Sequence, residues 1–407
     1  MRGRLRLADA IDLGACVRCG LCAESCHYYR TSGDARATPA YKVRLAGEVL
    51  RAGNGAGTAM AEPRATEWVD ELFGRCSMCG RCTAHCTSTV NVAGLVRSSR
   101  TRLAAAGLVP TDLQATVNTA VKTGNSMGIT REEWIETVQW LEEELRAETG
   151  DPAARLPIDQ PGADFLYAVN PREPKFFPLS LLAAGAIFHA AGASWTLASD
   201  WFDLTNYGLF SGDDEAAALF ASRLRQAMRR LGARALVLGE CGHGFNANRW
   251  RAPEWLNEAD PPRVLSVLEL VAGYVREGRL RLDPSRNAAP VTLHDPCNLV
   301  RLGGIVEEPR AILSAAVAHW SEMTPHGEQN FCCGGGGGQL AMARFAKRRL
   351  AAGQLKAEQI QRTGAHVVAA PCHNCVDQLT DLNKQYSLGV QVKTVCELVA
   401  GALVWST

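Results

Sequence analysis

The sequence predicts a cysteine-rich α-helical module followed by an α/β domain that contains two related units. Two cysteine quartets with identical spacing lie within the first 86 residues. From about residue 165 onward, short apolar runs alternate with long helical patterns, as they do in α/β folds. The stretch Arg225–Gly244 is also repeated, with changes, as Ala357–Cys375. These three observations set the fold class.

Length and composition limit the classes of function that the chain could have. A chain of 407 residues favours two or three domains. Its 43 basic and 42 acidic side chains give a net charge of +1, so we expect no nucleic-acid partner. The start of the chain lacks the apolar core of a signal peptide, and we expect a cytoplasmic protein. The 15 cysteines are then more typical of metal ligands than of disulfides.

The two quartets predict iron–sulfur clusters. "CVRCGLCAESC" and "CSMCGRCTAHC" both follow C-x2-C-x2-C-x3-C, which wraps three thiolates around one face of a cubane cluster. In two-cluster ferredoxins the fourth cysteine of each run serves the other cluster. We therefore expect one [4Fe–4S] cubane on Cys16, Cys19, Cys22 and Cys86, and a second on Cys76, Cys79, Cys82 and Cys26. Structural zinc fits less well, because its four thiolates usually come as two separated pairs.

The 49 residues between Cys26 and Cys76 show helical periodicity and exceed what a compact bacterial ferredoxin places there. This arrangement resembles the helical ferredoxin domain of respiratory iron–sulfur subunits, which we assign to residues 1–100. The glycine-rich "AGNGAGTAM" within it lacks the preceding strand and the following lysine of a phosphate loop. We predict an ordinary loop there.

Residues 101–164 are expected to form a helical connector and a linker. "TREEWIETVQWLEEELRAE" begins with Thr130 as a cap and acidic residues in the first turn, and its apolar positions recur at helical spacing. "TGDPAARLPIDQPGAD" follows as the linker. The next apolar stretch, 176–198, is long enough for a membrane span. It is rich in Ala and Gly and contains Pro178 and His189, so we expect a buried helix running into a strand.

The repeated element divides the rest of the chain. "RALVLGECG" and "AHVVAAPCH" read as short strands that each end at a cysteine. When Cys241 is aligned with Cys372, Gly244 falls where Cys375 stands. We predict a degenerate unit over 165–285 that has lost ligands, and a complete unit over 286–407.

The complete unit contains the pattern C-x34-CC-x38-C-x2-C in "HDPCNL", "FCCGGGG" and "APCHNC". It resembles the cysteine-rich CCG domain of heterodisulfide reductase catalytic subunits. That resemblance implies that five cysteines bind one non-cubane [4Fe–4S] cluster that splits or forms disulfides: Cys297, Cys332, Cys333, Cys372 and Cys375. Adjacent cysteines can serve neighbouring irons, while glycines let the backbone approach and offer N–H groups to sulfur.

The first unit has "FDLTNYGLFSG" where the double cysteine should stand, so we expect no second non-cubane cluster. The resemblance narrows to the D-type heterodisulfide reductase subunit and the cytoplasmic subunit of the complex associated with dissimilatory sulfite reductase. Candidate residues for a pocket facing the cluster are Asp203, Asn206, Tyr207, Cys241 and His243. Cys241 is consistent with an extra ligand, a redox thiol or an inert buried thiol. Cys396 lies on an apolar helical pattern and is expected in the core.

Five further polar residues adjoin the ligands: His85, His294, His373, Glu240 and Asp295. A histidine there could carry the proton that a departing thiolate needs, or simply hydrogen-bond to sulfur.

Together these features predict an iron–sulfur oxidoreductase subunit that passes electrons through two cubanes to a disulfide-active centre. The substrate would be a small disulfide-type molecule or a thiol carrier protein. Because the chain has no flavin or nicotinamide fingerprint, a redox partner subunit must supply electrons. The resemblance implies a membrane cytochrome of b type, which would hold the chain at the inner face of the membrane, and a flavoprotein is the other possibility. The alternative function is a non-catalytic relay between a flavin dehydrogenase subunit and quinone or a cytochrome b.

Overall fold

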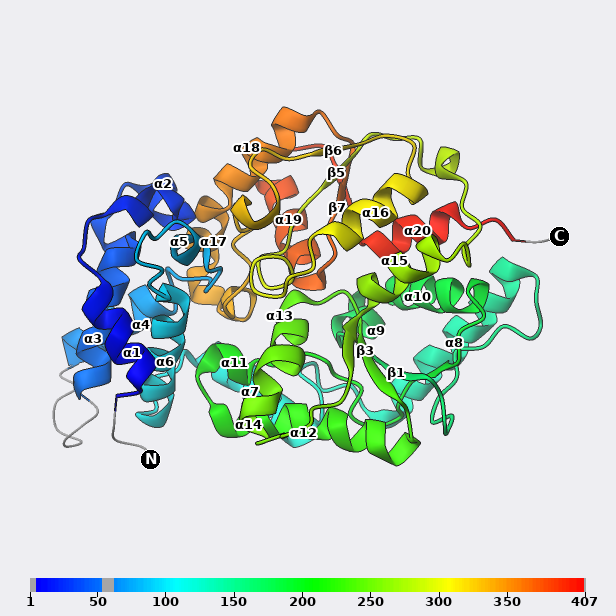
Figure 1. Cartoon of the computed structure of the whole chain (residues 1–407), viewed down its shortest axis with the longest axis horizontal. Coiled ribbons are helices and arrows are strands. Elements are labelled where there is room, and N and C mark those ends of the chain that lie inside the picture. The colour runs from blue at the N-terminus through cyan, green and yellow to red at the C-terminus, as the bar shows by residue number, and fades with distance from the viewer. Residues whose placement is uncertain (1–4, 53–61, 406–407) are drawn as a thin grey trace.

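A computed structural model describes residues 5–52 and 62–405 of the chain. An N-terminal helical module lies at one end of the molecule, beside a larger α/β part (Figure 1). The helices of this module are α1 (Leu7–Ala15), α2 (His27–Ser32), α3 (Pro39–Ala52), α4 (Glu62–Leu72), α5 (Arg81–Ala84) and α6 (Val92–Ala105). The predicted helical insert is therefore present. Its glycine-rich loop, 53–60, lies outside the described residues.

The helical module is held together by an apolar core between α3, α4 and α6. Leu45 and Val49 of α3 pack in one cluster with Leu72 and Val96. The two cysteine runs between these helices share a backbone conformation. Gly20 and Gly80 take the same place in their runs and have φ values of +81° and +72°, a region that glycine enters without strain.

The connector is helical and packs onto the α/β part. It comprises α7 (Thr111–Thr123) and α8 (Arg131–Thr149). Thr130 caps α8 as predicted: its hydroxyl accepts from the N–H of Glu133, whose carboxylate accepts from the N–H of Thr130. Trp134 and Leu141 of α8 lie in the same apolar core as the first sheet. The connector is thus part of that core.

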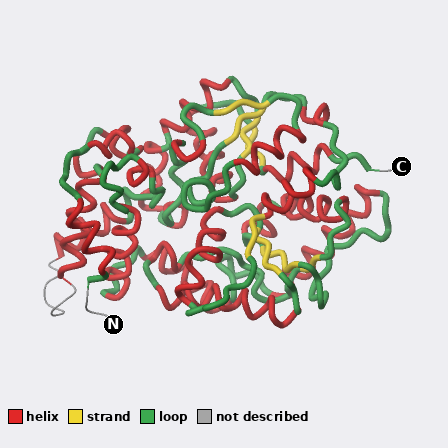
Figure 2. Tube along the Cα trace, viewed as in Figure 1, coloured by secondary structure: helices red, strands yellow, loops and turns green. Residues whose placement is uncertain are grey.

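The α/β part contains two four-stranded parallel sheets, drawn in yellow as two separate groups in Figure 2. The first contains β1 (Phe165–Ala168), β2 (Trp195–Thr196), β3 (Ala235–Leu238) and β4 (Val264–Ser266), in the order β2-β1-β3-β4. The second contains β5 (Val291–Leu293), β6 (Trp320–Glu322), β7 (Val367–Ala369) and β8 (Gln391–Lys393), in the order β6-β5-β7-β8. Both sheets therefore have the same strand order along the chain.

Helices surround each sheet. Around the first lie α9 (Arg172–Phe176), α10 (Pro178–Ala190), α11 (Gly208–Ser211), α12 (Asp214–Leu231), α13 (Gly242–Phe245), α14 (Ala252–Trp255) and α15 (Val267–Arg276). Around the second lie α16 (Glu307–Ala316), α17 (Ala346–Ala352), α18 (Gln354–Thr363), α19 (His373–Tyr386) and α20 (Val395–Ala402). Between the sheets, α10 packs against α20 and α15 against α16. One apolar core joins both.

The long apolar stretch folds as expected, into α10 followed by β2. No helix among the described residues combines the length and apolar character needed to cross a bilayer.

Candidate functional site

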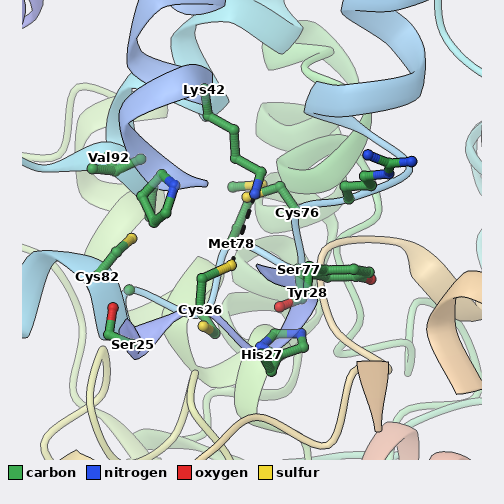
Figure 3. Close-up of a pocket in the computed structure, with 15 residues that line it drawn as sticks. Ser25, Cys26, His27, Tyr28, Lys42, Cys76, Ser77, Met78, Cys82 and Val92 are labelled. Carbon is green, nitrogen blue, oxygen red and sulfur yellow. Dashed lines mark hydrogen bonds between the residues drawn. The ribbon is translucent and has the colours of Figure 1, made fainter. Parts of the chain in front are cut away.

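Four cysteines from both quartets line one cavity of the helical module. Cys26 stands just before α2, Cys82 lies in α5, and Cys76 and Cys79 lie in the loop between α4 and α5. The cavity holds about 370 Å³ of space between its lining atoms, part of it open to solvent (Figure 3). These are the four ligands predicted for one cubane by the rule that the fourth cysteine of each run binds the cluster of the other run.

Lys42 extends from α3 into this cavity. Its Nζ lies 3.8 Å from the Cys26 Sγ and 2.5 Å from the Ala37 carbonyl oxygen, and its side chain is buried (Figure 3). Burial alone would lower the pKa of Lys42. The negative charges of Cys26 and Cys76 outweigh this effect, so the pKa is raised overall. A buried cation therefore stands beside the four sulfurs.

The other quartet gathers at the surface. Burial raises the pKa of Cys22, and the nearby charges of Cys16, Cys86 and Cys19 add to the increase. Cys19 is exposed, whereas the other three are partly buried. The structure thus brings together each predicted set of four thiols, one at the surface and one further inside.

The five cysteines of the second α/β unit also converge, and all are buried. The Cys297 and Cys332 sulfurs are 3.9 Å apart, and those of Cys333 and Cys375 are 3.5 Å apart. The N–H of Cys375 donates to the Cys372 carbonyl oxygen at 2.8 Å, which keeps these two cysteines together. The convergence follows from topology, because Cys297 and Cys372 come after the adjacent parallel strands β5 and β7.

The glycine run after the double cysteine has two roles. The N–H of Gly334 donates to the Cys332 sulfur at 3.3 Å, which agrees with the expected N–H contacts to sulfur. Gly337, with φ +66°, packs on the backbone of Ser77, where an added Cβ would lie 2.7 Å from the Ser77 carbonyl carbon. Part of the run is therefore glycine because it touches the loop between Cys76 and Cys79, a contact that the sequence did not reveal.

Two arginines, of which Arg100 is buried, fix this contact, which we call the joint. The Arg100 guanidinium donates to the carbonyl oxygens of Gly337 at 2.7 Å and Cys76 at 2.8 Å, and also to those of Leu72 and Phe210. Burial lowers the pKa of Arg100 to about 10. Arg301 donates to the Cys79 carbonyl oxygen at 2.7 Å.

Across the joint, Cys79 and Cys332 are neighbours, and the interaction between their side chains raises the pKa of the Cys79 thiol. Cys79 lines the inner cavity of the helical module, and Cys332 belongs to the converging group of the second unit. The two groups of cysteines are therefore adjacent across the joint.

Cys241 lies beside the C-terminal cysteines, since the N–H of the next residue, Gly242, donates to the Cys372 sulfur at 3.5 Å. His243 Nδ1 is 3.2 Å from the Cys241 sulfur. The Tyr207 ring lies 5.4 Å from the His243 ring. Of the five predicted pocket residues, these three lie together.

Asp203 and Asn206 make local contacts instead. The Asp203 carboxylate accepts from the N–H groups of Ser126 at 2.8 Å and Thr205 at 2.6 Å. The Asn206 side chain bonds to the backbone of Leu209 and Ala217. These partners are backbone groups, as is common for Asp and Asn in loops, and the place of both residues in a substrate pocket stays a prediction.

Of the polar residues that adjoin the ligands in sequence, one lies near the sulfurs and two bond to other groups. One ring nitrogen of His294 lies within 4.8 Å of the Cys333 and Cys375 sulfurs, and within the described chain both of its nitrogens lack a hydrogen-bond partner. Burial lowers the pKa of His294 to about 3. By contrast, Glu240 accepts from the first N–H groups of α20, and Asp295 pairs with Arg310.

For the two remaining histidines, His373 and His85, no hydrogen bond to a cysteine sulfur is seen among the described residues. His373 Nδ1 is 3.0 Å from the Glu240 carbonyl oxygen. His85 lies after α5, and burial lowers its pKa. Cys396 lies in α20 and is buried in the core, as expected.

The residues present fit iron–sulfur clusters. All three groups consist of thiols, the ligands that such clusters require. Both ring nitrogens of buried His27, beside the inner cavity, lack a partner within the described chain, as do those of His294 at the second site. Polar atoms of this kind are rarely left unpaired in a protein interior, and the sulfides of a cluster would supply acceptors.

Comparison with known proteins agrees with this geometry. Residues 12–90 match the family described as 4Fe-4S dicluster domain, and residues 291–380 match the one described as cysteine-rich domain. The chain is thus an iron–sulfur subunit resembling those of heterodisulfide-reductase-like complexes.

Three relatives illustrate the resemblance. The Hdr-like menaquinol oxidoreductase iron-sulfur subunit of Archaeoglobus profundus is 28% identical over 98% of this chain and 80% of its own length. The D-type subunit of the dihydromethanophenazine:CoB–CoM heterodisulfide reductase of Methanosarcina barkeri is 25% identical over 99% of this chain and 97% of its own. The EtfAB:quinone oxidoreductase of Syntrophomonas wolfei is 23% identical over 92% of this chain, which spans 55% of that protein.

Sequence reasoning missed three buried cations near the sulfurs: Lys42, Arg100 and Lys356. Lys356 donates to the Asn330 side chain at 2.5 Å, and burial lowers its pKa to about 8. A signal did exist for the first two. Lys42 lies in register with the apolar stripe of α3, and Arg100 with that of α6.

Proposed function

We propose that this chain carries electrons through two [4Fe–4S] cubanes to a non-cubane [4Fe–4S] centre, which reduces or forms a disulfide-type substrate. In this proposal, Cys16, Cys19, Cys22 and Cys86 hold the outer cubane, and Cys26, Cys76, Cys79 and Cys82 hold the inner one. Cys297, Cys332, Cys333, Cys372 and Cys375 hold the non-cubane centre.

The observation that carries the proposal is the closeness of the two groups of cysteines across the joint, where Arg100 bonds to the Cys76 and Gly337 carbonyl oxygens. Exposed Cys19 marks the outer quartet, and the inner quartet reaches the C-terminal group through Cys79 and Cys332. An electron entering at the surface would thus meet thiol groups along the way to the buried end. This order suits delivery from an external donor to an enclosed reaction centre.

Bound iron–sulfur clusters exchange single electrons, so a two-electron disulfide reaction needs two successive deliveries. Reduction consumes one disulfide, two electrons and two protons, and releases two thiols. The chain's own residues would hold and enclose the centre. The buried cysteines exclude water, and the Gly334 N–H stabilises negative charge on the Cys332 sulfur.

We also propose that the α/β part consists of two related units, the first degenerate, with boundaries near 165–285 and 286–407. The shared strand order supports this. At Gly244, the equivalent of Cys375, an added Cβ would lie 2.3 Å from a Leu204 methyl carbon. His243 is flanked by the Tyr207 ring and, at 5.1 Å, by the Phe210 ring. Side chains thus occupy the place of a second centre, which favours a single non-cubane cluster.

The helical module would correspond to residues 1–100 and the connector to 101–164. The electron donor or acceptor would dock where Cys19 is exposed. A membrane cytochrome of b type or a flavoprotein fits this role, and the former would hold the chain at the inner membrane face. The names of the relatives include both a menaquinol oxidoreductase and an EtfAB:quinone oxidoreductase, so they favour a quinone-linked partner.

Two measurements on the anaerobically purified chain test the proposal. Three tetranuclear clusters require about twelve irons per chain, with matching acid-labile sulfide. After oxidation in the presence of a thiol, we expect a new paramagnetic signal that is absent from the Cys333→Ala variant. About eight irons and no thiol-dependent signal would instead support a relay without disulfide chemistry.

A further inference from the structure

We propose that Cys241 is a sixth thiolate ligand of the C-terminal centre, supplied by the first α/β unit. The inference rests on the proposed non-cubane centre but goes beyond the five-cysteine pattern. The first, degenerate α/β unit would then supply one ligand to the centre that the second unit binds.

The two units interlock at the position of this cysteine. Cys241 follows β3 and caps α13, just as Cys372 follows β7 and caps α19. The N–H of Gly242 donates to the Cys372 sulfur at 3.5 Å, and the N–H of His373 donates to the Glu240 carbonyl oxygen at 3.0 Å. Each turn therefore bonds to the other, and the two equivalent cysteines face each other across the interface.

The contact leaves Cys241 close to the five predicted ligands. The next residue, Gly242, donates its N–H to the Cys372 sulfur at 3.5 Å, and Cys375 lies 3.5 Å from Cys333. Cys241 is fully buried. An iron bound at Cys372 would therefore lie close to this sulfur.

The surroundings of the Cys241 sulfur suit an anionic ligand. The Asn170 amide donates to it at 3.6 Å, and the His243 ring nitrogen lies 3.2 Å away. An inert apolar thiol needs no such donors, whereas a thiolate bound to iron is stabilised by N–H groups around its sulfur. The second ring nitrogen of His243 is buried without a partner within the described chain.

Neighbouring positions of the first unit, by contrast, carry no cysteine. Gly244 has no room for a side chain beneath Leu204, and Tyr207 and Phe210 fill space beside His243. Only the position that touches the other unit keeps its sulfur. This contrast favours a retained function for Cys241.

The test compares Cys241→Ala and Cys241→Ser with Cys396→Ser in the full, cluster-loaded chain. Cys396 is the matched control because it is equally buried but lies in α20, with its N–H bonded to Glu240. Iron content, ⁵⁷Fe Mössbauer spectra and the paramagnetic signal of the thiol-oxidised state are recorded for each. We expect both Cys241 variants to change the spectrum of the C-terminal centre, and Cys241→Ala to lose part of its iron, while the cubane signals remain.

Wild-type spectra and iron content in both Cys241 variants would overturn the inference. If Cys241→Ala fails to fold, Cys241→Ser decides, because it changes a single atom and its oxygen ligand alters the Mössbauer parameters of any iron that it binds. An equal spectral change in Cys396→Ser would also refute it, since the effect would then be general to buried cysteines. A wild-type chain with no third centre would instead refute the proposed function.

Discussion

Lys42 provides a quantitative test of how the chain tunes its inner cubane. The substitution Lys42→Met keeps an unbranched side chain of similar length but removes the buried positive charge beside the Cys26 sulfur. A nearby cation stabilises the reduced, more negative state of a cluster. We therefore expect the variant to lower the midpoint potential of one cubane, leaving the other two centres unchanged.

The magnitude follows from the separation. Two unit charges at the 3.8 Å between Lys42 Nζ and the Cys26 Sγ interact by about 4.4 kcal/mol at an effective dielectric constant of about 20. Since about 1.36 kcal/mol corresponds to a factor of ten and about 59 mV for one electron, the upper bound is roughly 190 mV. The added electron spreads over the whole cluster, so its mean distance from Lys42 is longer. We expect a shift of roughly 50–150 mV to more negative potential.

The assay is an anaerobic redox titration followed by electron paramagnetic resonance. Lys42→Arg keeps the charge and should stay close to the wild type. Arg44→Met removes a positive charge from the same helix at a side chain that is 43% exposed, and solvent screening should leave its shift small. A Lys42→Met potential within about 15 mV of the wild type, or equal to that of Arg44→Met, would refute the reasoning.

Three further predictions follow from the other sites. Cys333→Ala should abolish disulfide turnover while dithionite still reduces the cubanes, and full turnover would contradict the assigned centre. Arg100→Met leaves four buried carbonyl groups without their donor, so chemical denaturation should show a loss of about 4 kcal/mol, against less for Arg100→Lys. Burial raises the pKa of Asp203 to about 6, above its unfolded value, so its stabilising contribution is present at low pH and lost as pH rises through 6. Wild-type stability, measured relative to Asp203→Asn, should therefore fall by about 1.3 kcal/mol between pH 5 and pH 7, and parallel curves would contradict this.

The sequence was sufficient for features that depend on local spacing. The cysteine quartets predicted which four thiols would line the inner cavity, and Thr130 with Glu133 predicted the start of α8. The strand runs ending at Cys241 and Cys372 were likewise predicted, because a parallel strand followed by a helix leaves a clear apolar pattern.

The missing features depend on partners far away in the chain. Nothing near Gly337 indicates that its backbone meets Ser77, about 260 residues earlier, and the same holds for the four carbonyl groups around Arg100. Asp203 was predicted to line the pocket because its segment stands where the double cysteine should be, yet its carboxylate is taken by backbone N–H groups. Local patterns reveal chemistry, while tertiary packing decides which groups remain available for it.

The joint has one more consequence, for the kinetics of the chain. The buried Arg100 guanidinium, bonded to the Cys76 and Gly337 carbonyl oxygens, fixes the loop of Cys79 beside the segment of Cys332, so neither side swings as a mobile carrier would. Electron transfer between the helical module and the α/β part then requires no diffusive search. The rate of this step should therefore not fall when the solvent is made more viscous.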